Sequence, residues 1–194
     1  MVRSKSEDRK KKSANFNGMT ALIADSSENF VKILTGMLVE FRLSQILTAQ
    51  DGEEATRIMN GKQIDIAFLD CVLTGVDGFA ITQSVRSKGG PNQMIPILIL
   101  TSHTQLENVT RARDCGANMV LAKPISAGGL FDRLFWAAEN PREFVTSENY
   151  FGPDRRFKIE GYPGGVARRA SDNIEIGTQT EPTLSQDEID ALFK

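Results

Sequence analysis

Residues 64–70, Ile-Asp-Ile-Ala-Phe-Leu-Asp, form an apolar run that ends on a carboxylate and is followed by a glycine-containing turn at 71–78. A short run this apolar predicts a parallel strand that is buried on both faces of a sheet. Its last residue, Asp70, then lies at the carboxyl edge of the sheet, where ligands bind in open α/β folds. Taken alone, an acidic residue at such a position more often caps the following turn. The neighbouring strands therefore decide its interpretation.

Apolar runs alternate with segments of helical spacing throughout residues 18–140. Strands are predicted at 19–24, 44–49, 64–70, 95–102 and 119–122, and helices at 30–41, 53–59, 79–87, 106–115 and 126–138. The alternation predicts an α/β fold with a doubly wound, five-stranded parallel sheet, and about 120 residues suffice for a single core.

The two ends of the chain have a different composition. Residues 1–17 are basic and polar, and residues 141–183 are rich in Gly, Pro, Ser and Thr, so both are predicted to be disordered. Two Arg-Arg motifs, at 155–156 and 168–169, each follow a tyrosine. Arginine pairs beside aromatic residues favour nucleic acid, acidic lipid or an acidic protein surface, and a solvated linker is the alternative.

Composition excludes several classes of protein. A formal net charge of −2 provides no general attraction to nucleic acid or to a membrane. No apolar stretch has the length of a signal peptide or of a membrane span, which predicts a cytoplasmic protein. The two cysteines, Cys71 and Cys115, match neither a metal-binding spacing nor a disulfide framework.

Chemically matched side chains follow four of the predicted strands. Asp25 follows the first strand, Asp70 ends the third, Thr101 lies at the end of the fourth and Lys123 follows the fifth. Because parallel strands bring these ends to one edge, the four residues are expected to converge. A carboxylate nucleophile that accepts a phosphoryl group, with a lysine and a divalent metal to neutralise its charge, accounts for this set. Carboxylate oxygens favour Mg²⁺, with Asp25 and Asp70 as ligands.

At these positions the sequence resembles the receiver domain of bacterial response regulators, most simply the chemotaxis regulators of the CheY type. The match covers residues 18–140 and runs through Asp25, Asp70, Asp77-Gly78, Thr101 and Lys123-Pro124. The resemblance implies a flavodoxin-like receiver fold in which Asp70 is phosphorylated by a histidine kinase or a histidine phosphotransfer protein. It also implies that the backbone carbonyl of Val72 completes the metal site and that the Lys123-Pro124 bond is cis.

Three positions depart from the family pattern. Ala24 stands where a second acidic residue is usual, Leu73-Thr74 replaces Met-Pro, and Val120 replaces an aromatic residue that normally switches on activation. The missing acid at Ala24 predicts weaker Mg²⁺ binding. Val120 predicts that the usual aromatic switch is lost.

The last stretch, residues 184–194, has the pattern of a short amphipathic helix. Ser185 and Glu188 have the spacing of a capping box, and Ile189, Leu192 and Phe193 share one face. This stretch resembles the amino-terminal peptide of the flagellar switch protein FliM, the segment that phosphorylated CheY recognises. The resemblance implies that this stretch docks on the flagellar switch or on a receiver. On the receiver, Val120 is smaller than the usual aromatic residue and is expected to leave a groove for it. A terminal helix with a purely structural role is the alternative.

Together these features predict a phosphorylated response regulator with no DNA-binding output domain and no enzymatic turnover, which acts by protein contact in chemotaxis or flagellar control. A scaffold that retains the fold without useful phosphorylation is the first alternative. A phosphatase with a carboxylate nucleophile is the second, and it requires a general acid near the nucleophile. Val72, two residues after Asp70, does not provide one.

Overall fold

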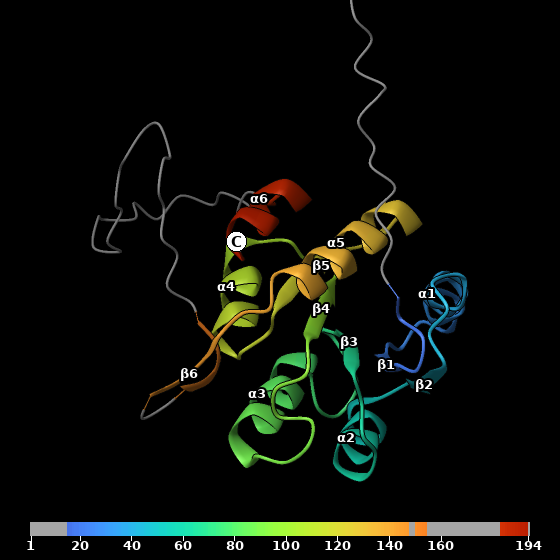
Figure 1. The fold of residues 1–194 in the computed structure, drawn as a ribbon. Helices are drawn as coiled ribbons and strands as arrows, with labels where there is room; N and C mark the ends of the chain where they lie inside the picture. Colours follow the sequence, from blue (N-terminus) through green and yellow to red (C-terminus); the bar gives the residue numbers. More distant parts are fainter. Residues whose placement is uncertain (1–14, 148–149, 155–182, 194) are drawn as a thin grey trace, which may run out of the picture.

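Five parallel strands form the centre of the molecule, in the order β2-β1-β3-β4-β5 (Figure 1). The computed structural model describes residues 15–147, 150–154 and 183–193. The strands are β1 (Thr20–Ala24), β2 (Gln45–Ala49), β3 (Ile66–Asp70), β4 (Ile97–Thr101) and β5 (Met119–Ala122). Every residue of β3 and β4 is buried, as the continuous apolar runs predict. The predicted five-stranded parallel sheet is confirmed.

Helices connect the successive strands. They are α1 (Glu28–Glu40), α2 (Gly52–Gly61), α3 (Gly78–Lys88), α4 (Leu106–Asp114) and α5 (Ala127–Glu139). Four of them begin at a Ser or Asp whose side chain accepts a hydrogen bond from the backbone N–H three residues later: Ser27, Asp51, Asp77 and Ser126. These caps satisfy N–H groups that have no partner within the helix, and they fix where each helix starts at the edge of the sheet.

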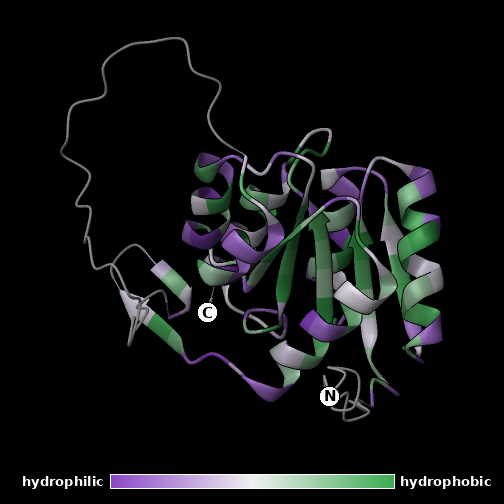
Figure 2. Cartoon of the chain, turned by 90° about the horizontal axis from the view of Figure 1, so that it is seen from above, coloured by the Kyte–Doolittle hydropathy of each residue, from purple (hydrophilic) through white to green (hydrophobic). Residues whose placement is uncertain are grey.

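The core has two parts, one on each face of the sheet. Alternate residues of β1 belong to different parts: Leu22 packs with α2, α3 and α4, whereas Ile23 packs with α1 and α5. Figure 2 shows the apolar strands between helices that carry both apolar and polar residues. This division gives the doubly wound arrangement, with helices covering both faces of a parallel sheet. In the described residues, no helix combines the length and apolar character needed to cross a membrane.

An antiparallel strand pair follows α5. The strands are β6 (Phe144–Ser147) and β7 (Tyr150–Pro153), and the Tyr150 hydroxyl donates to the Pro153 carbonyl at 2.7 Å. Residues 141–183 are predicted from the sequence to be largely disordered, and this strand pair is an ordered element within that range. Residues 155–182, with both Arg-Arg motifs, lie outside the described residues.

The ordered part of the chain begins earlier than the predicted end of the basic arm at residue 17. Phe16 is buried, and its ring lies 6.3 Å from the ring of Phe131 in α5 in an edge-on arrangement. Burial of an aromatic side chain holds residues 15–17 against the domain, so the ordered part begins before residue 18. Residues 1–14 lie outside the described part of the chain.

Arg86 of α3 is buried, although its sequence context is that of a surface helix. Its guanidinium donates to the backbone carbonyls of Gly116, Gln93 and Ile95 at 3.0, 2.5 and 2.9 Å, and to the Asn118 side-chain oxygen at 2.9 Å. The Phe144 ring of β6 lies over it, at 5.1 Å. Burial lowers the pKa of Arg86 to about 10, and it remains charged at neutral pH.

The last described element, α6 (Gln186–Ala191), lies against β5, beside α4 and α5 (Figure 1). Ser185 and Glu188 form a capping box at its first turn, as the sequence predicts. Ile189 and Phe193 are almost fully buried, and Leu192 is half-buried. The amphipathic face of α6 thus packs on the domain.

Candidate functional site

The carboxyl ends of three neighbouring strands, β1, β3 and β4, place the predicted site residues together. Asp25 follows β1, Asp70 ends β3, and Thr101 ends β4. Lys123 reaches them from the end of β5. Asp25 and Thr101 are almost completely buried and Asp70 is 9% exposed, so Asp70 is the more accessible of the two carboxylates.

Lys123 joins the two carboxylates. Its ammonium donates to Asp25 Oδ2 at 2.5 Å and to Asp70 Oδ2 at 2.8 Å. Burial by itself lowers the pKa of Lys123, but the hydrogen bonds and charges of both aspartates outweigh it and raise the pKa above its usual value. Lys123 is therefore a permanent positive charge at the site. The bond that follows it, Lys123-Pro124, is cis, as the resemblance implies.

Asp70 is held by its own turn. Its second oxygen, Oδ1, accepts a hydrogen bond from the Val72 backbone N–H at 3.2 Å. The turn closes on Gly78, the first residue of α3, where a Cβ atom would lie only 2.3 Å from the Asp70 carbonyl oxygen. Only glycine allows this approach, which explains why Gly follows Asp77 in the sequence. Each Asp70 oxygen keeps a lone pair for a further ligand.

The Thr101 hydroxyl sits in a small hydrogen-bonded network. It accepts from the His103 backbone N–H at 2.8 Å and donates to the His103 carbonyl at 3.0 Å. The thiol of Cys71, whose pKa burial raises, contacts it at 3.1 Å. Thr101 thus connects the residue after Asp70 to the loop that leads into α4.

Two features of the site were missed by sequence reasoning. The Phe30 ring of α1 lies 4.5 Å from the Lys123 ammonium, in a cation–π contact. The helical spacing of residues 30–41 gives no sign of this contact. The Cys71–Thr101 contact is the other, and no sequence pattern pairs a cysteine with a threonine across two strands.

The donor set fits a hard cation. Asp25 and Asp70 contribute carboxylates at one edge, and Val72, two residues after Asp70, donates its backbone N–H to Asp70 Oδ1. Ala24 is fully buried beside Asp25, so the second acid of the family pattern has no replacement there. Among the described residues no three of His, Cys, Asp or Glu gather into a metal cluster, and ligation would need water and phosphoryl oxygens.

Comparison with known proteins identifies a family that matches the fold. Residues 21–135 match the model of the response regulator receiver domain. The transcriptional regulatory protein PdtaR of Mycobacterium tuberculosis is 31% identical over 127 residues, which are 66% of this chain and 60% of PdtaR. The chain thus spans less than two thirds of that relative.

Solved structures show the same fold. The chemotaxis response regulator CheY4 of Vibrio cholerae superposes with a TM-score of 0.56 at 26% identity, over 60% of this chain and 95% of CheY4. The receiver domain of the Francisella response regulator 1452 gives 0.56 at 22% identity, over 63% and 99%, and at that identity it supports the fold alone. With the family match covering more than half of its length, the chain belongs to the response regulator receiver domain family.

Proposed function

We propose that this receiver domain accepts a phosphoryl group on Asp70 from a histidine kinase or a histidine phosphotransfer protein. The observation that carries the proposal is the 2.8 Å contact between Asp70 Oδ2 and the Lys123 ammonium at the carboxyl end of β3. It places a permanent positive charge beside the one site carboxylate that retains access to solvent. The Lys123 ammonium would pair with the negative charge of a phosphoryl group on Asp70.

The chemistry uses groups that the site already holds. An Asp70 carboxylate oxygen attacks the phosphorus of a phosphohistidine; as the new P–O bond forms, the P–N bond breaks, and the imidazole leaves and takes up a proton from water. The product on the chain is an aspartyl phosphate. Lys123 pairs with its charge, and the Thr101 hydroxyl donates to one of its oxygens.

Mg²⁺ is the proposed cofactor, held by Asp25, Asp70 and the Val72 carbonyl. When bound, it neutralises the negative charge that gathers on the transferred phosphoryl oxygens. Asp25 is suited to this role because its Oδ1 accepts from the Ser27 N–H at 2.8 Å and its Oδ2 accepts from Lys123, which fixes the carboxylate in place.

Changing Ala24 to Asp is expected to tighten Mg²⁺ binding by roughly tenfold, because a further carboxylate beside Asp25 adds attraction for the cation. The matched control is Ala24→Asn, because Asn has the shape of Asp without its charge. It shows how much of the effect comes from disturbing this buried position. Titration calorimetry with Mg²⁺ measures both. Equal affinities for the Asp and Asn variants would contradict the role assigned to charge at position 24.

Signalling is proposed to proceed by protein contact in the cytoplasm and not by catalytic turnover. A chemotaxis or flagellar setting is favoured by two likenesses, that of the domain to CheY4 and that of residues 184–194 to the FliM amino-terminal peptide. The name of PdtaR points instead to transcription, but that relative extends well beyond the matched region. The flagellar switch and a second receiver are the proposed partners of residues 184–194.

The alternative is a scaffold that is never usefully phosphorylated. It is favoured because Lys123 already bridges Asp25 and Asp70, and because Ala24 provides no second carboxylate for the metal. Incubation with radiolabelled acetyl phosphate and Mg²⁺ separates the two. We expect label that is stable to denaturant and lost in hydroxylamine, as for an acyl phosphate. Absence of label at saturating donor would establish the scaffold.

A further inference from the structure

Residues 183–193, termed here the C-terminal segment, cover the outer edge of the central sheet. Strand β5 is an edge strand, and in the described residues no strand pairs with its free side. The Gln186 side chain takes that place: its amide donates to the Val120 carbonyl at 2.9 Å, and its oxygen accepts from the Ala122 N–H at 2.6 Å. One glutamine amide thus makes the pair of bonds that a neighbouring strand would make.

Apolar burial adds to this contact. Ile189 and Phe193 are at most 1% exposed and belong to the same buried cluster as Val109 of α4 and Val120 of β5. Removal of these two large apolar side chains from water stabilises the docked segment. The C-terminal segment therefore occupies a real groove between α4 and β5, next to the small Val120.

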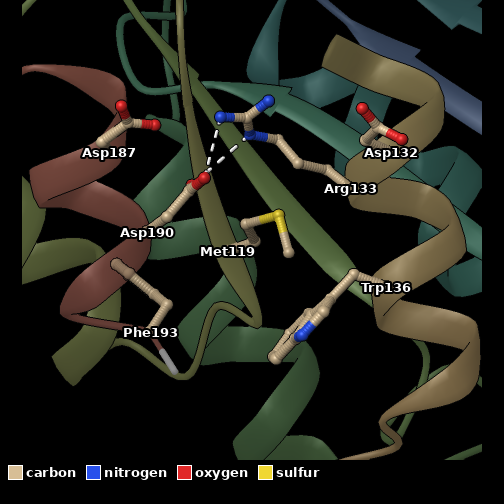
Figure 3. A pocket seen from close by; sticks show the side chains of 7 residues that line it. All are labelled: Met119, Asp132, Arg133, Trp136, Asp187, Asp190 and Phe193. Atoms are coloured by element: carbon tan, nitrogen blue, oxygen red, sulfur yellow. Dashed lines mark hydrogen bonds and ion pairs between the residues drawn. The ribbon is translucent and has the colours of Figure 1, made fainter. Parts of the chain in front are cut away.

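An ion pair closes the other side. Arg133 of α5 donates to Asp190 of α6 at 2.8 Å, and both side chains are less than one-fifth exposed (Figure 3). Beneath the pair, Met119, Trp136 and Phe193 line a cavity of about 300 Å³. The cavity lies between α5 and α6 and opens to solvent.

Two of the contacts of the C-terminal segment are made with residues close in sequence to Thr101 and Lys123. At one end the Leu184 N–H donates to the Thr104 carbonyl at 2.8 Å, three residues beyond Thr101. At the other end Ala122, which Gln186 holds, immediately precedes Lys123. Thr101 and Lys123 therefore lie three residues and one residue, respectively, from backbone groups that hold the segment.

We propose that the C-terminal segment is a built-in ligand that covers the groove between α4, β5 and α5 while Asp70 is unphosphorylated, and that phosphorylation of Asp70 releases it. The inference rests on the proposed function, since it requires the aspartyl phosphate. Release would expose the groove and the segment together to other proteins.

The direction follows from the hydroxyl of Thr101. It has one proton, which it donates to the His103 carbonyl at 3.0 Å. A phosphoryl oxygen is the stronger acceptor, so phosphorylation removes that bond and frees the loop leading to Thr104. The docked arrangement, in which Thr104 accepts from Leu184, is the one in which the Thr101 hydroxyl donates to the His103 carbonyl. Phosphorylation and docking are therefore antagonistic, and each weakens the other by the same factor.

Hydrogen exchange of the full chain, followed by mass spectrometry with and without acetyl phosphate and Mg²⁺, measures release. Docking protects the amides of the C-terminal segment, so we expect phosphorylation to raise their exchange rate by about fivefold or more. The Asp70→Asn variant should not respond. In Gln186→Ala the segment should exchange fast before any donor is added. The matched control is Gln45→Ala, an exposed glutamine on the opposite edge strand.

The reverse effect is measured with beryllofluoride, a non-covalent analogue of the phosphoryl group. Gln186→Ala should bind it more tightly than the unmodified chain, and Gln45→Ala should not differ, because docking and analogue binding are linked equilibria. A chain that takes up label on Asp70 while the exchange of residues 183–193 stays unchanged or slows would overturn the release and leave the proposed function intact. A chain that takes up no label would overturn both.

Discussion

Replacing Asp70 with Asn is expected to reduce phosphoryl labelling to background. The amide oxygen of Asn is not a nucleophile for phosphorus, and no other carboxylate of the site can take over. Asp25 is fully buried and bonded through both oxygens, to the Ser27 N–H and to Lys123. Labelling with radioactive acetyl phosphate and Mg²⁺, followed by gel filtration, measures the effect.

We expect the Asp70→Asn variant to fold, because Lys123 keeps Asp25 as a partner and Asn preserves the shape of the side chain. Its circular dichroism spectrum checks this. The matched control is Asp132→Asn, an exposed carboxylate on α5. It should label like the unmodified chain. Retention of label in a folded Asp70→Asn variant would show that the phosphoacceptor is another residue.

Replacing Arg86 with Met should lower the free energy of unfolding by about 3 kcal/mol, because Arg86 is buried and makes four hydrogen bonds inside the domain. Met matches the length of the arginine stem but leaves the carbonyls of Gly116, Gln93 and Ile95 without their donor inside the domain. Loss of the Phe144 contact adds to this. Urea unfolding followed by circular dichroism gives the value.

The control is Arg57→Met on the exposed face of α2, where a change within about 0.5 kcal/mol is expected. The comparison removes any general effect of exchanging a charge for an apolar side chain. If Arg86→Met and Arg57→Met were equally stable, the hydrogen bonds of Arg86 would have no net importance for folding.

The sheet and its site could be predicted from the sequence because both depend on local patterns. Short apolar runs fix the strands, and in a parallel sheet the end of each strand must meet the same edge. Asp25, Asp70, Thr101 and Lys123 lie where their strands end, so their convergence follows from the topology alone. Helix caps such as Ser126 are local in the same way.

Features that depend on distant partners could not be predicted. Arg86 stands among polar residues in the sequence, and only the carbonyls of two remote loops make its burial favourable. Strands β6 and β7 have four residues each, too short for a periodic pattern, and Phe144 depends on Arg86 for its contact. For residues 184–194 the helix and its cap were predictable, whereas the pairing of Gln186 with β5 was not.

Reduction of the phosphorylated chain with borohydride tests the central claim most directly, because it converts an acyl phosphate to an alcohol at the residue that carried it. Peptide mass spectrometry then locates the change. We expect it in the peptide that contains Asp70, dependent on Mg²⁺ and on the phosphoryl donor, and at no other carboxylate. Modification of Asp25 or of a residue outside the site, or no modification at all, would contradict the assignment of Asp70 as the phosphoacceptor.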